Sequence, residues 1–262
     1  MSPEHIRLER QDAVATLTFN RPEIYNAMDE PMIRGLRDAT HSLAADPTLR
    51  VLIIAGAGKA FIAGGDVAMF YKRRETLAAE IRPMIETLHE AIIALRDAPF
   101  PVVAKIHGAV AGAGVSLALA CDFSIAADNA VFTTAYAKIG QSPDGGSTYF
   151  LPRIVGMKKA AELIMLTEPV KAAEALALGL VNKVVAADAL DAEVAAFAAR
   201  LASGPTQAYA RAKRLMNQTF DSALGVQLAR EADFFVECAA TADFKEGVTA
   251  FVEKRAPRFS GQ

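Results

Sequence analysis

The sequence predicts an α/β protein with a helical C-terminal region. Apolar runs of strand length alternate with amphipathic helical patterns up to about residue 146, and after that point helical patterns dominate. The chain has 262 residues, of which 52% are hydrophobic and 22% charged, so it is large enough for a sizeable globular core. We place the core at residues 1–200 and the C-terminal helical region at residues 201–262.

In the N-terminal half, Val14–Phe19 alternates between apolar and polar residues as a half-buried strand does. Asp29 is a good N-cap, and Pro31 stands near the first position of a helix that runs to about Ala45. Val51–Ala55 is apolar throughout and predicts a buried strand. The next helix is marked by apolar residues at helical spacing, namely Ile81, Met84, Ile85, Leu88, Ile92 and Leu95.

Two prolines, Pro99 and Pro101, end that helix, and Val102–Ile106 predicts another buried strand. Gly112–Ala120 is small and apolar enough for a core helix. Two short strands follow, at Phe123–Ala126 and Val131–Thr133. The remaining helices are expected at Lys159–Leu166, Ala172–Leu178, Asp188–Ala202, Thr206–Phe220, Leu224–Cys238 and Asp243–Arg255, with one strand at Val181–Val185.

Charge and cysteine content narrow the functional classes. Twenty-eight basic and 30 acidic residues give a formal charge of −2, so we expect neither a nucleic-acid partner nor a membrane partner. Cys121 and Cys238 form no CxxC pair, and the four histidines lack zinc spacing, so we expect no disulfide framework and no metal. The charged start of the chain lacks the apolar run of a secretory signal, and we expect a cytoplasmic location.

Two glycine-bearing stretches, Ala55–Phe70 and Lys105–Ala126, each place small residues where a strand gives way to a helix. Backbone N–H groups are free at such a junction, and the helix dipole favours negative charge there. Two junctions could therefore direct two N–H donors at one carbonyl oxygen and stabilise an oxyanion or enolate. The alternative for these glycines is tight turns and close helix packing.

Asp144 lies between Pro143 and a glycine pair, directly before the helix-like run TYFLPRIVG. It could be a turn or N-cap aspartate, which is the usual role of Asp in such a setting. It could also be a general base beside an apolar pocket. Asp66 has a similar position at the start of a helix, where an N-cap or backbone anchor is expected.

Three common signatures are excluded. The dinucleotide fingerprint fails because Leu117 stands at its third glycine, and the phosphate loop fails because Ile53 stands at its first glycine. Ser116 lies in a sequence that faintly resembles a nucleophile elbow. That fold needs a histidine after the serine, and all four histidines precede it.

Taken together, several motifs resemble the crotonase family, also called the enoyl-CoA hydratase/isomerase superfamily, nearly from end to end. They are NRPEIYNAMD at 20–29, KAFIAGGD at 59–66, HGAVAGAGVSLALACD at 107–122, IGQSPDGGSTYFLPR at 139–153, EALALGLVNKVV at 174–185 and FKEGVTAFVEKRAPRF at 244–259. The resemblance implies a spiral core of ββα units and a C-terminal helical region that builds trimers, often paired into hexamers.

The resemblance also implies a ligand and its contacts. Members bind acyl-CoA thioesters, and two backbone N–H groups hold the thioester carbonyl as it becomes an enolate. By position the donors match Gly65 and Ala113. The residues matched to CoA and substrate contacts are Ile24, Ala63, Gly65, Asp66, Val67, Ala68, Ala113 and Tyr136, and the pocket walls are expected to include Met69, Phe70, Tyr71, Met84 and Tyr136.

The sequence departs from the hydratase pattern at two positions. Hydratases of the family carry two glutamates that hold and activate water, and the matching residues here are Ser116 and Tyr136. Neither can shuttle protons near neutral pH as a carboxylate does. Asp144 matches a position where some isomerases and a dehalogenase of the family carry a catalytic aspartate.

The resulting prediction is an isomerase that moves a double bond in an unsaturated acyl-CoA, or that carries out the ring-opening isomerisation of a phenylacetyl-CoA derivative. Asp144 would serve as its general acid/base, and Gly65 and Ala113 as its oxyanion donors. No cofactor is expected, since CoA is part of the substrate. Two alternatives stay open: an enoyl-CoA hydratase, and a non-catalytic binder of acyl-CoA or RNA.

Overall fold

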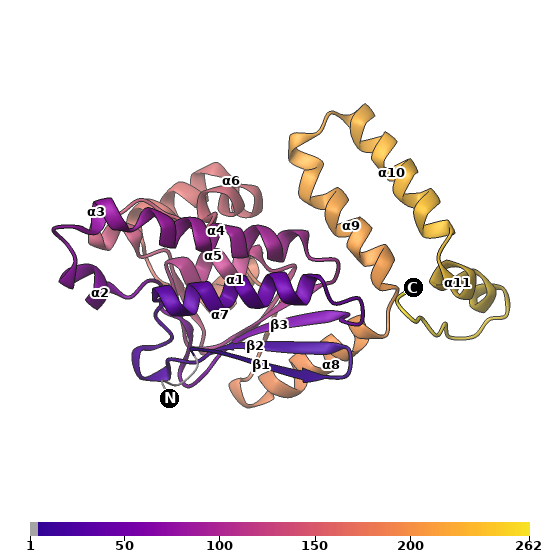
Figure 1. Cartoon of the computed structure of the whole chain (residues 1–262), viewed down its shortest axis with the longest axis horizontal. Helices are drawn as coiled ribbons and strands as arrows, with labels where there is room; N and C mark the ends of the chain where they lie inside the picture. The colour runs from indigo at the N-terminus through magenta and orange to yellow at the C-terminus, as the bar shows by residue number, and fades with distance from the viewer. Residues whose placement is uncertain (1–4) are drawn as a thin grey trace.

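The computed structural model describes residues 5–262, and residues 1–4, which begin the charged N-terminal segment, lie outside the described residues. The chain forms two sheets, several helices around them, and a helical arm at the C-terminus (Figure 1). The larger sheet has six strands in the order β1-β2-β3-β5-β7-β10, with bounds β1 Ile6–Gln11, β2 Val14–Phe19, β3 Val51–Gly56, β5 Val102–Ile106, β7 Phe123–Ala127 and β10 Lys183–Val185.

The smaller sheet has four strands in the order β4-β6-β8-β9, with bounds β4 Ala60–Ile62, β6 Ala109–Ala111, β8 Val131–Thr133 and β9 Val170–Lys171. Parallel pairing links β3 to β5 to β7 in the first sheet and β4 to β6 to β8 in the second. Each repeat of the spiral thus adds one strand to each sheet: β3 and β4, then β5 and β6, then β7 and β8. This repeat is the ββα spiral that the sequence resemblance implies, and the expected fold class is confirmed.

The core of the spiral lies between the sheets and the helices α1 (Glu30–Ala44), α4 (Arg82–Asp97) and α5 (Ala113–Ala120). Asp29 caps α1 by accepting a hydrogen bond from Met32 N. All eight residues of α5 are buried, as the run of small and apolar residues predicts. On the outer face of the larger sheet, α8 (Leu190–Ala202) covers β3, β5 and β7.

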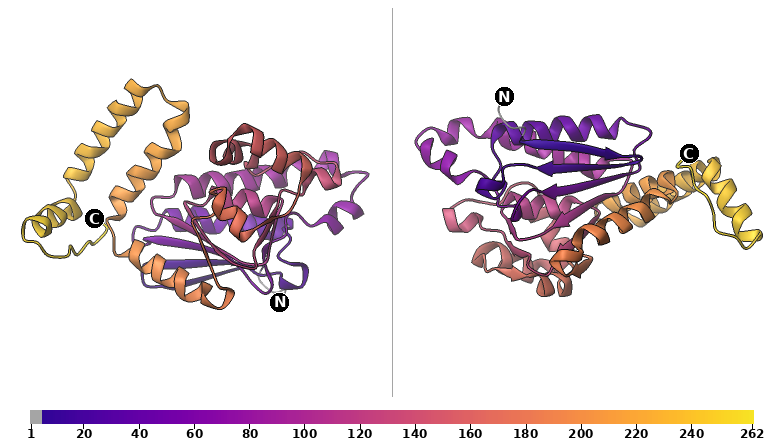
Figure 2. Two further views of the ribbon diagram at one scale, coloured as in Figure 1. Left: turned by 180° about the vertical axis from the view of Figure 1, so that it is seen from behind. Right: turned by 90° about the horizontal axis from the view of Figure 1, so that it is seen from below.

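Seven further helices complete the core and form the arm. The bounds are α2 Val67–Lys72, α3 Leu77–Glu80, α6 Ser147–Leu166, α7 Ala172–Ala177, α9 Thr206–Gln218, α10 Leu224–Ala239 and α11 Ala242–Val252, of which the last three are the arm. Figures 1 and 2 show α10 and α11 extending away from the body of the molecule, while α9 connects them to it. The domain division at residue 200 falls inside α8 and stays a prediction.

Helix α9 is attached to the core by a buried lysine. The Lys213 Nζ lies 2.7 Å from Oδ2 of Asp122 and donates to the backbone oxygens of Leu95 and Phe100 at 2.8 and 3.3 Å. Burial lowers the pKa of Lys213 from its ordinary value. Within residues 5–262, no helix combines the length and apolar character needed to cross a membrane.

Candidate active site

Most of the predicted site residues line a cavity of about 1000 Å³ in the spiral core. Its walls come from four segments of the chain: residues 28–33 at the start of α1, residues 63–89 from the turn after β4 into α4, residues 112–113 at the start of α5, and residues 135–144 before α6. Apolar side chains such as Ile33, Phe70, Met84 and Leu88 line it together with Tyr136 and Asp144. The cavity therefore combines apolar walls with polar and charged side chains such as Arg74, Lys138 and Asp144, a composition that suits a small-molecule site.

The first glycine turn, residues 63–65, joins β4 to α2. Gly64 has a φ of 90°, and its carbonyl accepts a hydrogen bond of 2.7 Å from Met28 N. Asp66 N donates in turn to Met28 O at 2.9 Å. These two bonds engage the neighbours of Gly65, while the Gly65 N–H itself finds no acceptor among residues 5–262. Gly65 lines the cavity, so its amide is available to a ligand.

The second glycine turn, residues 111–113, joins β6 to α5. Gly112 has a φ of 49°, and a Cβ placed on it would lie 3.5 Å from the Cα of Gly64, so the two turns are in close contact. Ala113 opens α5, and its N–H also has no acceptor in the part of the chain that the structure describes. Both open amides thus belong to neighbouring turns on one cavity wall, one of them at a helix N-terminus.

Asp144 is held by two hydroxyl groups. The Tyr136 hydroxyl donates to its Oδ1 at 2.6 Å, and the Ser116 hydroxyl donates to its backbone oxygen at 2.9 Å. Ser116 is fully buried in α5, so it fixes the turn that carries Asp144. Among residues 5–262, no group donates to Oδ2 of Asp144. One carboxylate oxygen is therefore engaged, and the other can exchange a proton with a ligand.

Tyr136 is a hydrogen-bond donor to Asp144 and not a base in this setting. Burial, and then the neighbouring Asp144 carboxylate, raise the pKa of its phenol well above the ordinary value of 10.0. The phenol therefore keeps its proton throughout the neutral range. It donates a hydrogen bond to Asp144 and cannot replace a glutamate as a base.

His89 is a cavity residue that sequence reasoning missed. It lies on α4, and its Nε2 accepts a hydrogen bond of 3.3 Å from Gly145 N, next to Asp144. The two partners are 56 positions apart, and nothing in the local pattern of α4 separates this histidine from a surface one. Only the fold brings them together.

The structure brings together most of the predicted site residues but not all. The cavity is lined by Ala63, Gly65, Val67, Ala113, Tyr136 and Asp144, and of the expected walls by Phe70, Tyr71 and Met84. Ile24, Asp66, Ala68 and Met69 are not among its lining residues. A contact of Ile24, Asp66 or Ala68 with CoA stays a prediction.

Asp66 has a structural role that the sequence did predict. Its Oδ1 accepts from Met69 N at 3.1 Å and caps α2. Its Oδ2 lies 3.2 Å from Arg21, and Arg21 also pairs with Asp29, the N-cap of α1, at 3.2 Å. One half-buried arginine therefore links the starts of two helices beside the first glycine turn.

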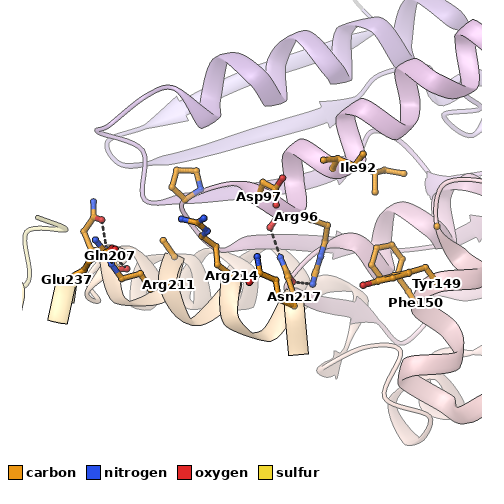
Figure 3. A pocket seen from close by; sticks show the side chains of 15 residues that line it. Ile92, Arg96, Asp97, Tyr149, Phe150, Gln207, Arg211, Arg214, Asn217 and Glu237 are labelled. Atoms are coloured by element: carbon orange, nitrogen blue, oxygen red, sulfur yellow. Dashed lines mark hydrogen bonds and ion pairs between the residues drawn. The ribbon is translucent and has the colours of Figure 1, made fainter. Parts of the chain in front are cut away.

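A second cavity of about 840 Å³ lies between α4, α6 and α9 (Figure 3). Arg96, Arg211 and Arg214 line it, and Arg96 and the Asn217 side chain are hydrogen-bonded to each other across α4 and α9. Gly146 also lines it, but no residue predicted for the site does. In residues 5–262, no group of three or more His, Cys, Asp and Glu side chains is arranged to hold a metal ion.

Comparisons with known proteins agree with this geometry. Residues 9–262 match the family described as enoyl-CoA hydratase/isomerase, and the chain belongs to that family. It is an enzyme of that family rather than merely a protein with a similar fold.

Some relatives are named as hydratases and others as isomerases. The chain is 38% identical to a probable enoyl-CoA hydratase of Rhodobacter capsulatus over 100% of both chains. It is 34% identical to the 1,2-epoxyphenylacetyl-CoA isomerase of Escherichia coli K12 over 99% of both chains. A crystal structure of an enoyl-CoA hydratase from Polaromonas sp. JS666 matches with a TM-score of 0.93 at 37% identity, covering 97% of this chain and 99% of the other.

Proposed function

We propose that this chain is a CoA-thioester isomerase that moves a double bond in an unsaturated acyl-CoA. The observation that carries the proposal is Asp144, a carboxylate that lines the same cavity as two open backbone amides and has one unengaged oxygen. The other carboxylate of the cavity lining, Glu86, has a side chain that is 57% exposed and pairs with Arg82. Asp144 is thus the only inner carboxylate among the described lining residues.

One carboxylate is sufficient for the reaction. With a 3-enoyl thioester, Asp144 removes a proton from C2, and the electron pair moves onto the thioester oxygen while the double bond remains conjugated to it. The Gly65 and Ala113 amides hold that oxygen, and each such donor is worth about 3 kcal/mol in comparable sites. Protonated Asp144 then delivers the proton to C4, the electrons return, and the C2–C3 double bond forms. Proton and electrons balance without a cofactor.

Tyr136 supports the first step by donating a hydrogen bond to Oδ1 of Asp144, which leaves Oδ2 to face the substrate. Rearrangement of the ring of a phenylacetyl-CoA derivative belongs to the same proposal. The name of the Escherichia coli relative favours it, and the cavity volume of about 1000 Å³ can accept a ring.

The second candidate is an enoyl-CoA hydratase, which the name of the Rhodobacter capsulatus relative favours. Hydration needs an activated water as well as a proton donor, and Ser116 and Tyr136 occupy the two positions matched to the hydratase glutamates. The buried hydroxyl of Ser116 is directed to the backbone of Asp144. The site therefore supplies one base where hydration uses two carboxylates.

A product screen decides between the two. Purified enzyme is incubated with 2-enoyl-CoAs and 3-enoyl-CoAs of several chain lengths, and with ring-bearing acyl-CoAs, in water enriched in heavy oxygen. We expect the absorbance of the conjugated 2-enoyl thioester to appear with no heavy oxygen in the product. Heavy oxygen in the acyl chain would establish hydration, and no turnover of any substrate would contradict both candidates.

We also propose that the chain assembles as a trimer or a dimer of trimers through its C-terminal arm. Helix α10 buries none of its residues against its own chain, and large apolar side chains stand exposed along the arm. They include Phe220, Leu224, Phe235, Val236 and Phe251, each at least 68% exposed. An apolar area of this kind is typical of a surface that another subunit covers.

A further inference from the structure

The imidazole of His89 has an unused hydrogen-bond donor. Its Nε2 accepts the Gly145 N–H at 3.3 Å, and a nitrogen that accepts a hydrogen bond carries no proton. In the neutral ring the proton is then on Nδ1. Within residues 5–262, Nδ1 has no acceptor, although the ring is only partly exposed.

The surroundings of His89 are apolar. Leu88 directly precedes His89 on α4, and Ile85 lies one helical turn before it. Both line the cavity, and Ile81 and Met84 extend the same apolar wall. Glu86 and Arg82 lie on this helix too, but their side chains are 57% and 83% exposed and pair with each other. His89 is therefore the polar group of α4 that lies on the inner part of the wall.

The position of His89 relative to Asp144 identifies the part of the ligand it faces. The two open amides hold the thioester oxygen in the proposed function, and Asp144 serves the carbons next to it. Because His89 contacts the residue that follows Asp144, it faces the acyl portion near or beyond those carbons. A purely hydrocarbon chain would leave the Nδ1–H without a partner in an apolar cavity, which costs binding free energy.

We propose that His89 is a specificity-determining residue that donates its Nδ1–H to an oxygen on the acyl portion of the substrate, so that the enzyme prefers acyl-CoAs bearing a keto, hydroxyl or epoxide oxygen beyond the thioester. This inference rests on the proposed function for the orientation of the ligand. It adds a substrate class to it, namely oxygenated acyl-CoAs.

Binding of saturated ligands tests the inference separately from catalysis. Isothermal calorimetry compares 4-oxopentanoyl-CoA with 4-methylpentanoyl-CoA, and 5-oxohexanoyl-CoA with 5-methylhexanoyl-CoA, so that a carbonyl replaces a methyl-bearing carbon of similar shape. None of these has a double bond to move. A neutral hydrogen bond gives a preference of about two- to twelvefold. We expect at least one oxo ligand to bind about fivefold or more tightly than its methyl partner.

Variants assign the preference to His89. His89→Leu should reduce the oxo-to-methyl ratio to about one, whereas His89→Gln, which keeps both an acceptor and a donor, should retain most of it. His41→Leu, on the exposed face of α1, is the matched control and should leave the ratio unchanged.

Nitrogen NMR of the native enzyme provides a readout that does not require any variant to fold. It should show the His89 ring protonated at Nδ1, with a signal that shifts when the oxo ligand binds and not when the methyl ligand binds. Equal affinities within both pairs, an unchanged ratio in His89→Leu, or a ring protonated at Nε2 would overturn the inference. A further outcome is that the oxo-to-methyl affinity ratio behaves as expected while no double bond moves in the product screen of the preceding subsection. In that case the proposed isomerase activity is wrong, and the preference for oxygenated acyl-CoAs is retained.

Discussion

The Tyr136 hydroxyl donates a 2.6 Å hydrogen bond to Oδ1 of Asp144, while the second carboxylate oxygen has no donor among residues 5–262. The phenol is held in the donor role because its pKa is raised by burial and by the carboxylate itself. The pair therefore works as a charged acceptor with a fixed neutral donor. A single carboxylate oriented in this way can accept a proton at one carbon and deliver it to another.

Asp144→Asn should abolish most turnover. The amide keeps the size and the acceptor for Tyr136 but cannot take a proton, so we expect kcat to fall by about a hundred- to ten-thousandfold. The dissociation constant of a saturated acyl-CoA should change by less than about threefold, because the substitution is nearly isosteric. Asp38→Asn, at an exposed position of α1, is the matched control. A variant that retains the full rate would show that Asp144 is not the base.

Tyr136→Phe should lower kcat by about tenfold with little effect on KM, since it removes one charge-assisted hydrogen bond of about 1.5 kcal/mol from Asp144. Tyr25→Phe, a half-exposed tyrosine, is the control. Steady-state kinetics of both variants measure the effect. An unchanged kcat would mean that the 2.6 Å bond does not support catalysis.

The pH profile of the native enzyme follows from the raised pKa of Tyr136. A phenol with a raised pKa loses its proton only above the ordinary value of about 10, so the donor is present at every pH below that. We expect the ratio of native to Tyr136→Phe kcat to stay constant from pH 7 to pH 10. A ratio that declines toward one between pH 8 and pH 9 would mean that the phenol ionises in this range.

Gly65→Ala tests the first glycine turn. A Cβ at this position would lie 2.8 Å from Cζ of Phe70, so the ring must move, and the adjacent amide moves with the turn. We expect kcat to fall by about a hundredfold, which is the cost of losing one oxyanion donor. The double variant Gly65→Ala/Phe70→Leu removes the far end of the ring and should recover at least about tenfold. No recovery would mean that the damage does not come from the Phe70 contact.

Much of the fold follows from the sequence, and the exceptions have physical causes. The C-terminal helices are found within a few residues of their predicted bounds, because their apolar spacing and alanine content are strong local signals. Strand β1 was missed because it is an edge strand with mostly exposed, charged residues. Helix α6 begins at Ser147 rather than Lys159, since Pro152 and the non-helical Gly156 conceal its first half.

The site was predictable in part for a similar reason. Gly65, Ala113 and Asp144 lie in turns with distinctive local sequence, and the resemblance to a family placed them in one site. The contacts of Asp144 with Tyr136 and of Gly145 with His89 depend on chain segments that meet only after folding. The same holds for Lys213, whose partner Asp122 lies in the turn between α5 and β7. The sequence around each residue does not identify a partner that is distant along the chain.

Lys213→Met should destabilise the protein. Lys213 is 5% exposed and its Nζ lies 2.7 Å from Asp122, so its replacement removes the nearest cation from a largely buried carboxylate and leaves only Arg96, at 3.8 Å. Breaking a buried pair from one side costs about 3 kcal/mol. Urea unfolding followed by circular dichroism measures the free energy of unfolding, with the exposed Lys158→Met as control. A loss below about 0.5 kcal/mol would show that Lys213 does not hold α9 to the core.

Phe235→Glu tests whether the arm joins subunits. Phe235 is 70% exposed on α10, so a glutamate there costs the isolated chain little, whereas in a covered interface it places a charge in an apolar environment. We expect sedimentation velocity to show a trimer or hexamer for the native enzyme and smaller species for the variant at the same concentration. The control is Glu231→Gln on the same helix, at a polar position. A native enzyme that sediments as a monomer, or a variant with an unchanged distribution, would contradict assembly through this helix.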